Sequence, residues 1–143
     1  MEKLKILFYG AGVIGSFYAA RLSASHDVTL LARGKRLQNL RENGLVVVDE
    51  DTGVSERYGI GFTERLAPED EYDYIFVTLR CNQLHPVLPE ISANCSKNVV
   101  FFMNAVTGYD TWREALGKRL LSGFPMAGGE IREGVVHIAT GAV

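Results

Sequence analysis

Compact apolar runs alternate with amphipathic stretches along most of the chain. Runs of this kind, bounded by glycine, proline or polar residues, are typical of strands buried on both faces. They lie at Leu4–Tyr9, Asp27–Leu31, Leu45–Val48, Tyr74–Leu79, Asn98–Met103 and Leu120–Phe124. Because helical patterns separate most of them, we expect an α/β fold with a mainly parallel sheet, in which Leu120–Phe124 is a sixth central strand.

Helical segments are bounded by recognisable start and stop residues. Helices are predicted after Gly15, over Gly34–Asn43, around Leu84, Val87, Leu88 and Ile91, and over Thr107–Leu116. Gly44 is a C-terminal stop, and Thr107 and Thr111 are candidate N-caps. Pro86 suits a first helical turn, whereas Pro89 is expected to kink or delay its helix.

Two further segments are compatible with hairpins. Arg57–Phe62 follows the turn residues 49–53 and is expected to pair back as a strand. Ile131–Ala139 is compatible with a hairpin around Gly134. The pattern holds no repeat and no low-complexity segment.

A glycine-rich turn joins the first predicted strand to the first helix. Its residues are Gly10, Ala11, Gly12, Val13, Ile14 and Gly15, a GxGxxG motif. Glycine accounts for 15 of the 143 residues, so the spacing alone is weak evidence. The motif gains weight because it follows a strand, opens a helix and lies in a βαβ unit with an expected right-handed crossover.

Each glycine of this motif has a mechanical role in a dinucleotide site. Gly10 allows the tight turn, Gly12 lets the backbone approach a pyrophosphate, and Gly15 allows close packing of helix and strand. The phosphates would bind free N–H groups at the helix N-terminus. We therefore expect residues 1–143 to form one doubly wound Rossmann domain with helices on both faces; a glycine turn without a ligand is the alternative.

The end of the second predicted strand carries cations and no acid. NAD-preferring domains place Asp or Glu here, about 20 residues after the loop, to bind the ribose 2′-hydroxyl. This chain has Arg33, Lys35 and Arg36 instead. A guanidinium can bind a 2′-phosphate in bidentate fashion, so the cofactor is predicted to be NADP(H), with Arg33 as the main contact. Lys35 or Arg36 could assist, although Arg36 is read first as a solvated surface charge.

The composition and the cysteine spacing argue against several classes of function. The chain is 47% hydrophobic and 22% charged, with a formal net charge of -2, which gives no general attraction to nucleic acid or an anionic membrane. No apolar run is long enough to span a bilayer or to form a signal peptide. Cys81 and Cys95 are not spaced as a metal or disulfide pair, so we expect reduced thiols, no metal and a cytoplasmic location.

Polar groups follow two later strands and define the expected substrate side. Ligands of such sheets bind beyond the carboxyl ends of the strands. Thr78 and Leu79 are candidate cofactor contacts, and Arg80 could hold a substrate carboxylate. Asn104 could bind substrate or the nicotinamide ribose. Asn82 is equally compatible with an N-cap and a ligand, while Gln83 fits a first-turn surface position. The histidines are read as structural or solvated; they are His26, His85 and His137.

The ordered set of motifs resembles the N-terminal domain of the ketopantoate reductase family, in a divergent branch. The matching pieces are Ile6–Leu22, Val28–Arg33, Tyr72–Arg80, Asn104, Gly123 and Val135–His137. The resemblance implies NADPH-dependent reduction of a 2-keto acid to a 2-hydroxy acid, as in pantothenate biosynthesis. It also implies that Asn104 contacts substrate or cofactor and that Arg80 replaces a family lysine. Ala105 stands where the family commonly has glycine.

The resemblance also implies a helical C-terminal domain that this sequence lacks. In the family that domain carries the catalytic lysine and a substrate-binding glutamate, and a homodimer could form through it. We therefore expect this chain alone to be inactive. A stand-alone NADP(H)-binding or sensor module is the alternative, and a 6-phosphogluconate-type dehydrogenase is a third interpretation.

Overall fold

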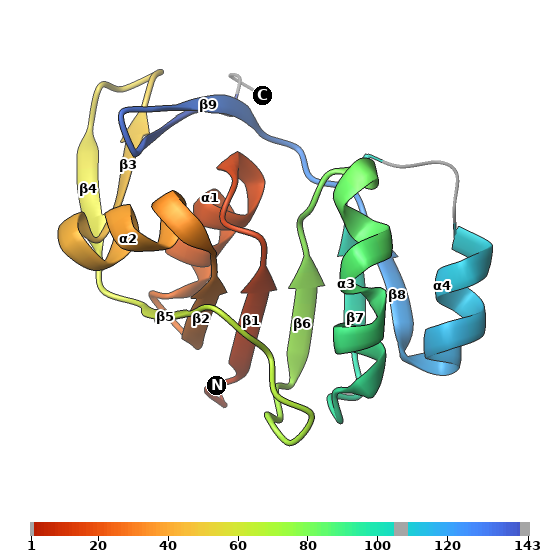
Figure 1. Cartoon of the computed structure of the whole chain (residues 1–143). Helices are drawn as coiled ribbons and strands as arrows, with labels where there is room; N and C mark the ends of the chain where they lie inside the picture. Colours follow the sequence, from red (N-terminus) through yellow and green to blue (C-terminus); the bar gives the residue numbers. More distant parts are fainter. Residues whose placement is uncertain (1, 105–108, 141–143) are drawn as a thin grey trace.

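A six-stranded parallel sheet forms the centre of the fold. The computed structural model describes residues 2–104 and 109–140 (Figure 1). The strands are β1 (Lys5–Tyr9), β2 (Asp27–Leu31), β5 (Gly61–Thr63), β6 (Tyr74–Val77), β7 (Val99–Phe102) and β8 (Leu120–Gly123). Their order is β5-β2-β1-β6-β7-β8, and every neighbouring pair is parallel. The carboxyl ends of all six strands therefore meet at one edge.

Four further strands form a second, smaller sheet of order β4-β3-β10-β9. They are β3 (Leu45–Asp49), β4 (Ser55–Tyr58), β9 (Gly128–Arg132) and β10 (Val135–Ala139). The β9–β10 hairpin turns at Glu133 and Gly134, whose φ angles of 49° and 81° are both positive, as a type I′ turn requires. Because β10 pairs in parallel with β3, the last part of the chain lies against its first half.

Helices cover both faces of the parallel sheet. They are α1 (Val13–Leu22), α2 (Gly34–Asn43), α3 (Cys81–Ala93) and α4 (Tyr109–Leu116), followed by the 3-10 turn η1 (Gly117–Arg119). Leu7 and Tyr9 of β1 point into a core shared with α3 and α4. Ile6 and Phe8 point to the opposite face, into a core shared with α1, α2 and the second sheet. The predicted doubly wound α/β fold is confirmed, with the second sheet beside α1 and α2 at the upper left of Figure 1.

Three strand predictions need correction. Leu45–Val48 forms a strand, but in the second sheet. Arg57–Phe62 is not one strand: β4 ends at Tyr58, paired antiparallel with β3, while Phe62 pairs with Leu30 at the edge of the parallel sheet. Gly59 and Ile60 belong to neither strand, and the glycine weakens the extended run at this point. Leu120–Phe124 forms an edge strand and not a central one, which explains the exposed Leu121.

The helix termini also differ in part from the prediction. Pro86 and Pro89 both lie inside one helix that begins at Cys81. We attribute its continuity to the buried face of Leu84, Val87, Leu88 and Ile91, whose burial offsets the hydrogen bonds that proline cannot make. Arg80, and not Asn82, is its N-cap. Thr111 lies inside α4, and Thr107 falls outside the described residues.

Candidate cofactor-binding site

The glycine motif forms the turn between β1 and α1. Gly10 has a φ of 123°, a region that L side chains rarely adopt, and its N–H donates to the carbonyl of Leu31 at 3.2 Å. A Cβ at Gly15 would lie 2.0 Å from the carbonyl oxygen of Gly10 and 2.5 Å from Oγ1 of Thr78. A Cβ at Gly12 would meet no atom within 4 Å. Gly10 and Gly15 are thus required by the fold, whereas Gly12 faces open space.

The first turn of α1 presents backbone donors at this open space. Gly12 is the N-cap and provides no side-chain cap. The first N–H of the helix to bond within it is that of Ser16, which donates to the carbonyl of Gly12 at 3.0 Å. Within residues 2–104 and 109–140, the N–H groups of Val13, Ile14 and Gly15 have no hydrogen-bond acceptor. An anion that approaches Gly12 from this side would therefore meet free donors and the positive end of the helix dipole.

Thr78 fixes the glycine turn from the neighbouring strand. Its hydroxyl donates to the carbonyl of Gly10 at 2.8 Å, and its N–H donates to the carbonyl of Tyr9 at 3.1 Å. Leu79 is half-buried, and its Cδ2 would lie 3.0 Å from a Cβ at Gly10. Both predicted cofactor contacts therefore lie beside the motif, and the Thr78 hydroxyl is used to hold the turn.

The structure corrects the expectation that Arg36 is a solvated surface charge. Its Nε donates to the carbonyl of Ala11 at 2.9 Å, its Nη2 to Oγ of Ser16 at 3.1 Å, and its Nη1 to the carbonyl of Gly134 at 3.0 Å. The side chain is half-buried, and this burial lowers the pKa of the guanidinium. Arg36 therefore ties the glycine turn and α1 to the β9–β10 turn, and it brings positive charge to the loop. Lys35 is exposed.

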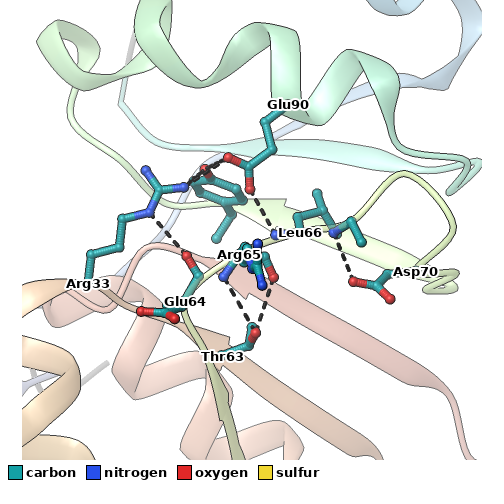
Figure 2. A network of polar contacts seen from close by, with 9 residues as sticks. Arg33, Thr63, Glu64, Arg65, Leu66, Asp70 and Glu90 are labelled. Carbon is teal, nitrogen blue, oxygen red and sulfur yellow. Dashed lines mark hydrogen bonds and ion pairs between the residues drawn. The ribbon is translucent and has the colours of Figure 1, made fainter.

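Arg33 lies at the carboxyl end of β2 and points towards α3 (Figure 2). Its Nη2 donates to the hydroxyl of Tyr9 at 2.8 Å and to Oε2 of Glu90 at 2.9 Å. Its Nε donates to the carbonyl of Glu64 at 3.2 Å. The side chain remains 52% exposed, so a ligand can reach it. Sequence reasoning missed Glu90 because nothing local distinguishes this acid from other helix-surface carboxylates.

The substrate-side candidates lie at the same sheet edge as the glycine motif. Arg80 and Asn104 follow the neighbouring parallel strands β6 and β7, and both are exposed. Gln83 accepts a hydrogen bond from the backbone N–H of Arg80 at 3.0 Å, which gives Gln83 a capping role at the start of α3. Ala105 falls outside the described residues. The structure therefore brings Arg80 and Asn104 to one edge.

The histidines and cysteines form no cluster at this edge, although Cys81 directly follows Arg80. His26 accepts a hydrogen bond from the N–H of Leu4, and His137 pairs with Glu50 in the second sheet. Cys81 and Cys95 are free and exposed. Across the described parts of the chain, no three His, Cys, Asp or Glu residues are positioned to hold a metal ion. In the same residues, no helix combines the length and hydropathy needed to cross a membrane.

Comparison with known families identifies the family to which this fold belongs. The family described as Ketopantoate reductase PanE/ApbA matches residues 6–143, nearly the whole chain. The chain belongs to the ketopantoate reductase family. Its members are 2-dehydropantoate 2-reductase-like, NAD(P)-dependent oxidoreductases, so the predicted resemblance is confirmed.

Individual ketopantoate reductase relatives agree with this assignment. A 2-dehydropantoate 2-reductase of Mesorhizobium japonicum is 30% identical over 92 residues, which are 62% of this chain and 27% of that protein. The crystal structure of a putative ketopantoate reductase from Ralstonia solanacearum has a TM-score of 0.79 at 24% identity, over 99% of this chain and 50% of the other.

A second similar structure contains NADH. The ternary structure of D-mandelate dehydrogenase with NADH and anilino(oxo)acetate has a TM-score of 0.78 at 23% identity, over 94% of this chain and 45% of that one. The chain thus spans about half the length of the solved structures it matches, or less, and a smaller share of the Mesorhizobium relative.

Proposed function

We propose that this chain is the cofactor-binding domain of an NADPH-dependent reductase that converts a 2-keto acid into a 2-hydroxy acid. One observation carries the proposal: the α1 N–H groups that have no acceptor among the described residues face the open space beside Gly12. Family membership supports the dinucleotide, and the cations after β2 support its 2′-phosphate. The residues present therefore fit NADP(H).

The roles of the chain's own residues follow from where they lie. The amides of Val13, Ile14 and Gly15 would hold the pyrophosphate, while Arg33 would bind the 2′-phosphate. Arg80 would orient the substrate carboxylate, and Asn104 would donate to the substrate or the nicotinamide ribose. NADPH supplies the hydride that reduces the keto carbon. The resulting alkoxide also needs a proton, for which we assign no donor in this chain.

Arg33→Ala should narrow the preference for NADPH over NADH. We expect roughly tenfold weaker NADPH binding and NADH affinity within about twofold of wild type, because only NADPH carries the 2′-phosphate. Fluorescence titration of the purified chain with both dinucleotides measures the two constants. Arg113→Ala is the matched control, since Arg113 is an exposed cation on α4. Equal affinities of the wild type for both dinucleotides, or no change in Arg33→Ala, would contradict the NADP(H) proposal.

The reductase activity should require more protein than this chain. We expect the purified chain to bind NADPH without steady oxidation when 2-keto acids are added, because the family resemblance implies that catalytic groups lie elsewhere. The protein expressed from its full reading frame should oxidise NADPH with at least one member of a 2-keto acid panel, followed by absorbance. Steady turnover by the chain alone, or no turnover of any 2-keto acid by the product of the full reading frame, would refute this assignment.

A further inference from the structure

Glu90 of α3 is anchored at the carboxyl end of the sheet by three different donors. Its Oε2 accepts from Nη2 of Arg33 at 2.9 Å and from the hydroxyl of Tyr9 at 3.1 Å. Its Oε1 accepts from the N–H of Leu66 at 2.8 Å (Figure 2). The side chain is only 28% exposed. The carboxylate is therefore a fixed negative charge beside the arginine that we assign to the 2′-phosphate.

The contacts of Arg33 leave few donors for a ligand. Nη2 donates hydrogen bonds to Glu90 and Tyr9, and Nε donates to the carbonyl of Glu64. Within the described part of the chain, only Nη1 has no acceptor. A bidentate grip on a phosphate needs two nitrogens, so a 2′-phosphate must either replace Glu90 at Nη2 or lie next to its charge.

Two of the three donors to Glu90 belong to residues other than Arg33, so the carboxylate could keep both contacts if the arginine moved. The Leu66 N–H belongs to the backbone after β5. Tyr9 is buried, and that burial together with the charge of Glu90 raises the pKa of its phenol to about 12. The phenol therefore remains a neutral O–H donor to the carboxylate at physiological pH.

We propose that Glu90 is a specificity-determining residue that weakens binding of the 2′-phosphate and so limits the preference for NADPH over NADH. The proposal rests on the NADP(H)-binding role of this domain. Repulsion between the carboxylate and a phosphate dianion disfavours NADPH alone, since NADH has an uncharged hydroxyl at the same position. If Glu90 instead served to hold Arg33 ready for phosphate, its removal would weaken NADPH binding, so the two roles predict opposite signs.

The variant Glu90→Gln tests whether the carboxylate weakens or strengthens NADPH binding. The amide keeps an oxygen for the Leu66 N–H but removes the charge. We expect NADPH to bind roughly fivefold more tightly, a modest gain because the ion pair is partly exposed, while NADH affinity stays within about twofold of wild type. Glu114→Gln removes the same charge from an exposed position on α4 and should change neither constant. Fluorescence titrations with NADPH and NADH supply all the values.

A second variant, Glu90→Ala, removes the carboxylate without introducing an amide, so it separates the loss of charge from any new contact of the glutamine. Thermal denaturation checks that both variants fold. Both should raise the ratio of NADPH to NADH affinity. An unchanged ratio, or weaker NADPH binding in the folded variants, overturns the role of Glu90. Failure of the wild-type chain to bind either dinucleotide would overturn the proposed function instead, so the two failures are distinguishable.

Discussion

Gly12→Ala should weaken dinucleotide binding by roughly a hundredfold while the free energy of unfolding stays within about 0.5 kcal/mol of wild type. The backbone of Gly12 has φ −74° and ψ −165°, which alanine adopts without strain, and its Cβ would touch no protein atom within 4 Å. The methyl group would instead occupy the space that a pyrophosphate needs to approach the α1 amides. Fluorescence titration with NADPH and urea denaturation measure the two quantities.

A matched glycine separates this effect from a general consequence of adding a methyl group. Gly59 lies between β4 and β5, and a Cβ there also meets nothing within 4 Å. Gly59→Ala should therefore leave both NADPH affinity and stability unchanged. Wild-type affinity in Gly12→Ala would show that the phosphates do not bind beside this residue.

Gly15→Ala should destabilise the protein by about 3 kcal/mol, a loss of folding free energy and not only of affinity. The new Cβ would lie 2.0 Å from the Gly10 carbonyl oxygen and 2.5 Å from Oγ1 of Thr78, so β1 and α1 would have to separate. In an unobstructed helix the same change stabilises by about 1 kcal/mol, which gives the two cases opposite signs. Urea denaturation measures the difference. A neutral or stabilising result would mean that the close packing of α1 on the glycine turn is wrong.

Local signals in the sequence predicted most of the strands and helices. The helix Gly34–Asn43 was predicted with the observed bounds because Gly44, with a φ of 76°, ends it as expected. The hairpin around Gly134 could also be predicted, since its turn needs positive φ angles, which glycine adopts readily. In both cases a glycine marks the boundary, so no distant contact is needed to place it.

Long-range pairing could not be predicted in the same way. Parallel pairing of β3 with β10 depends on chain segments far apart in sequence, and no residue in Leu45–Asp49 signals a second sheet. For the same reason, the role predicted for Arg36 was wrong and the role predicted for Arg33 was incomplete. Arg36 reaches Gly134 across 98 positions, and Arg33 meets Glu90 across 57. Only the packing of α3 and of the second sheet creates these partners.

The most direct test of phosphate binding at α1 is to follow the backbone amide resonances of the isotopically labelled chain while NADPH is added. The amides of Gly12, Val13, Ile14 and Gly15 should show the largest shifts, because the last three would donate to the pyrophosphate and Gly12 would lie beside it. The amide of Gly59 should not move. Large shifts confined to another part of the chain, with these four resonances unchanged at saturating NADPH, would contradict a dinucleotide site at the glycine motif.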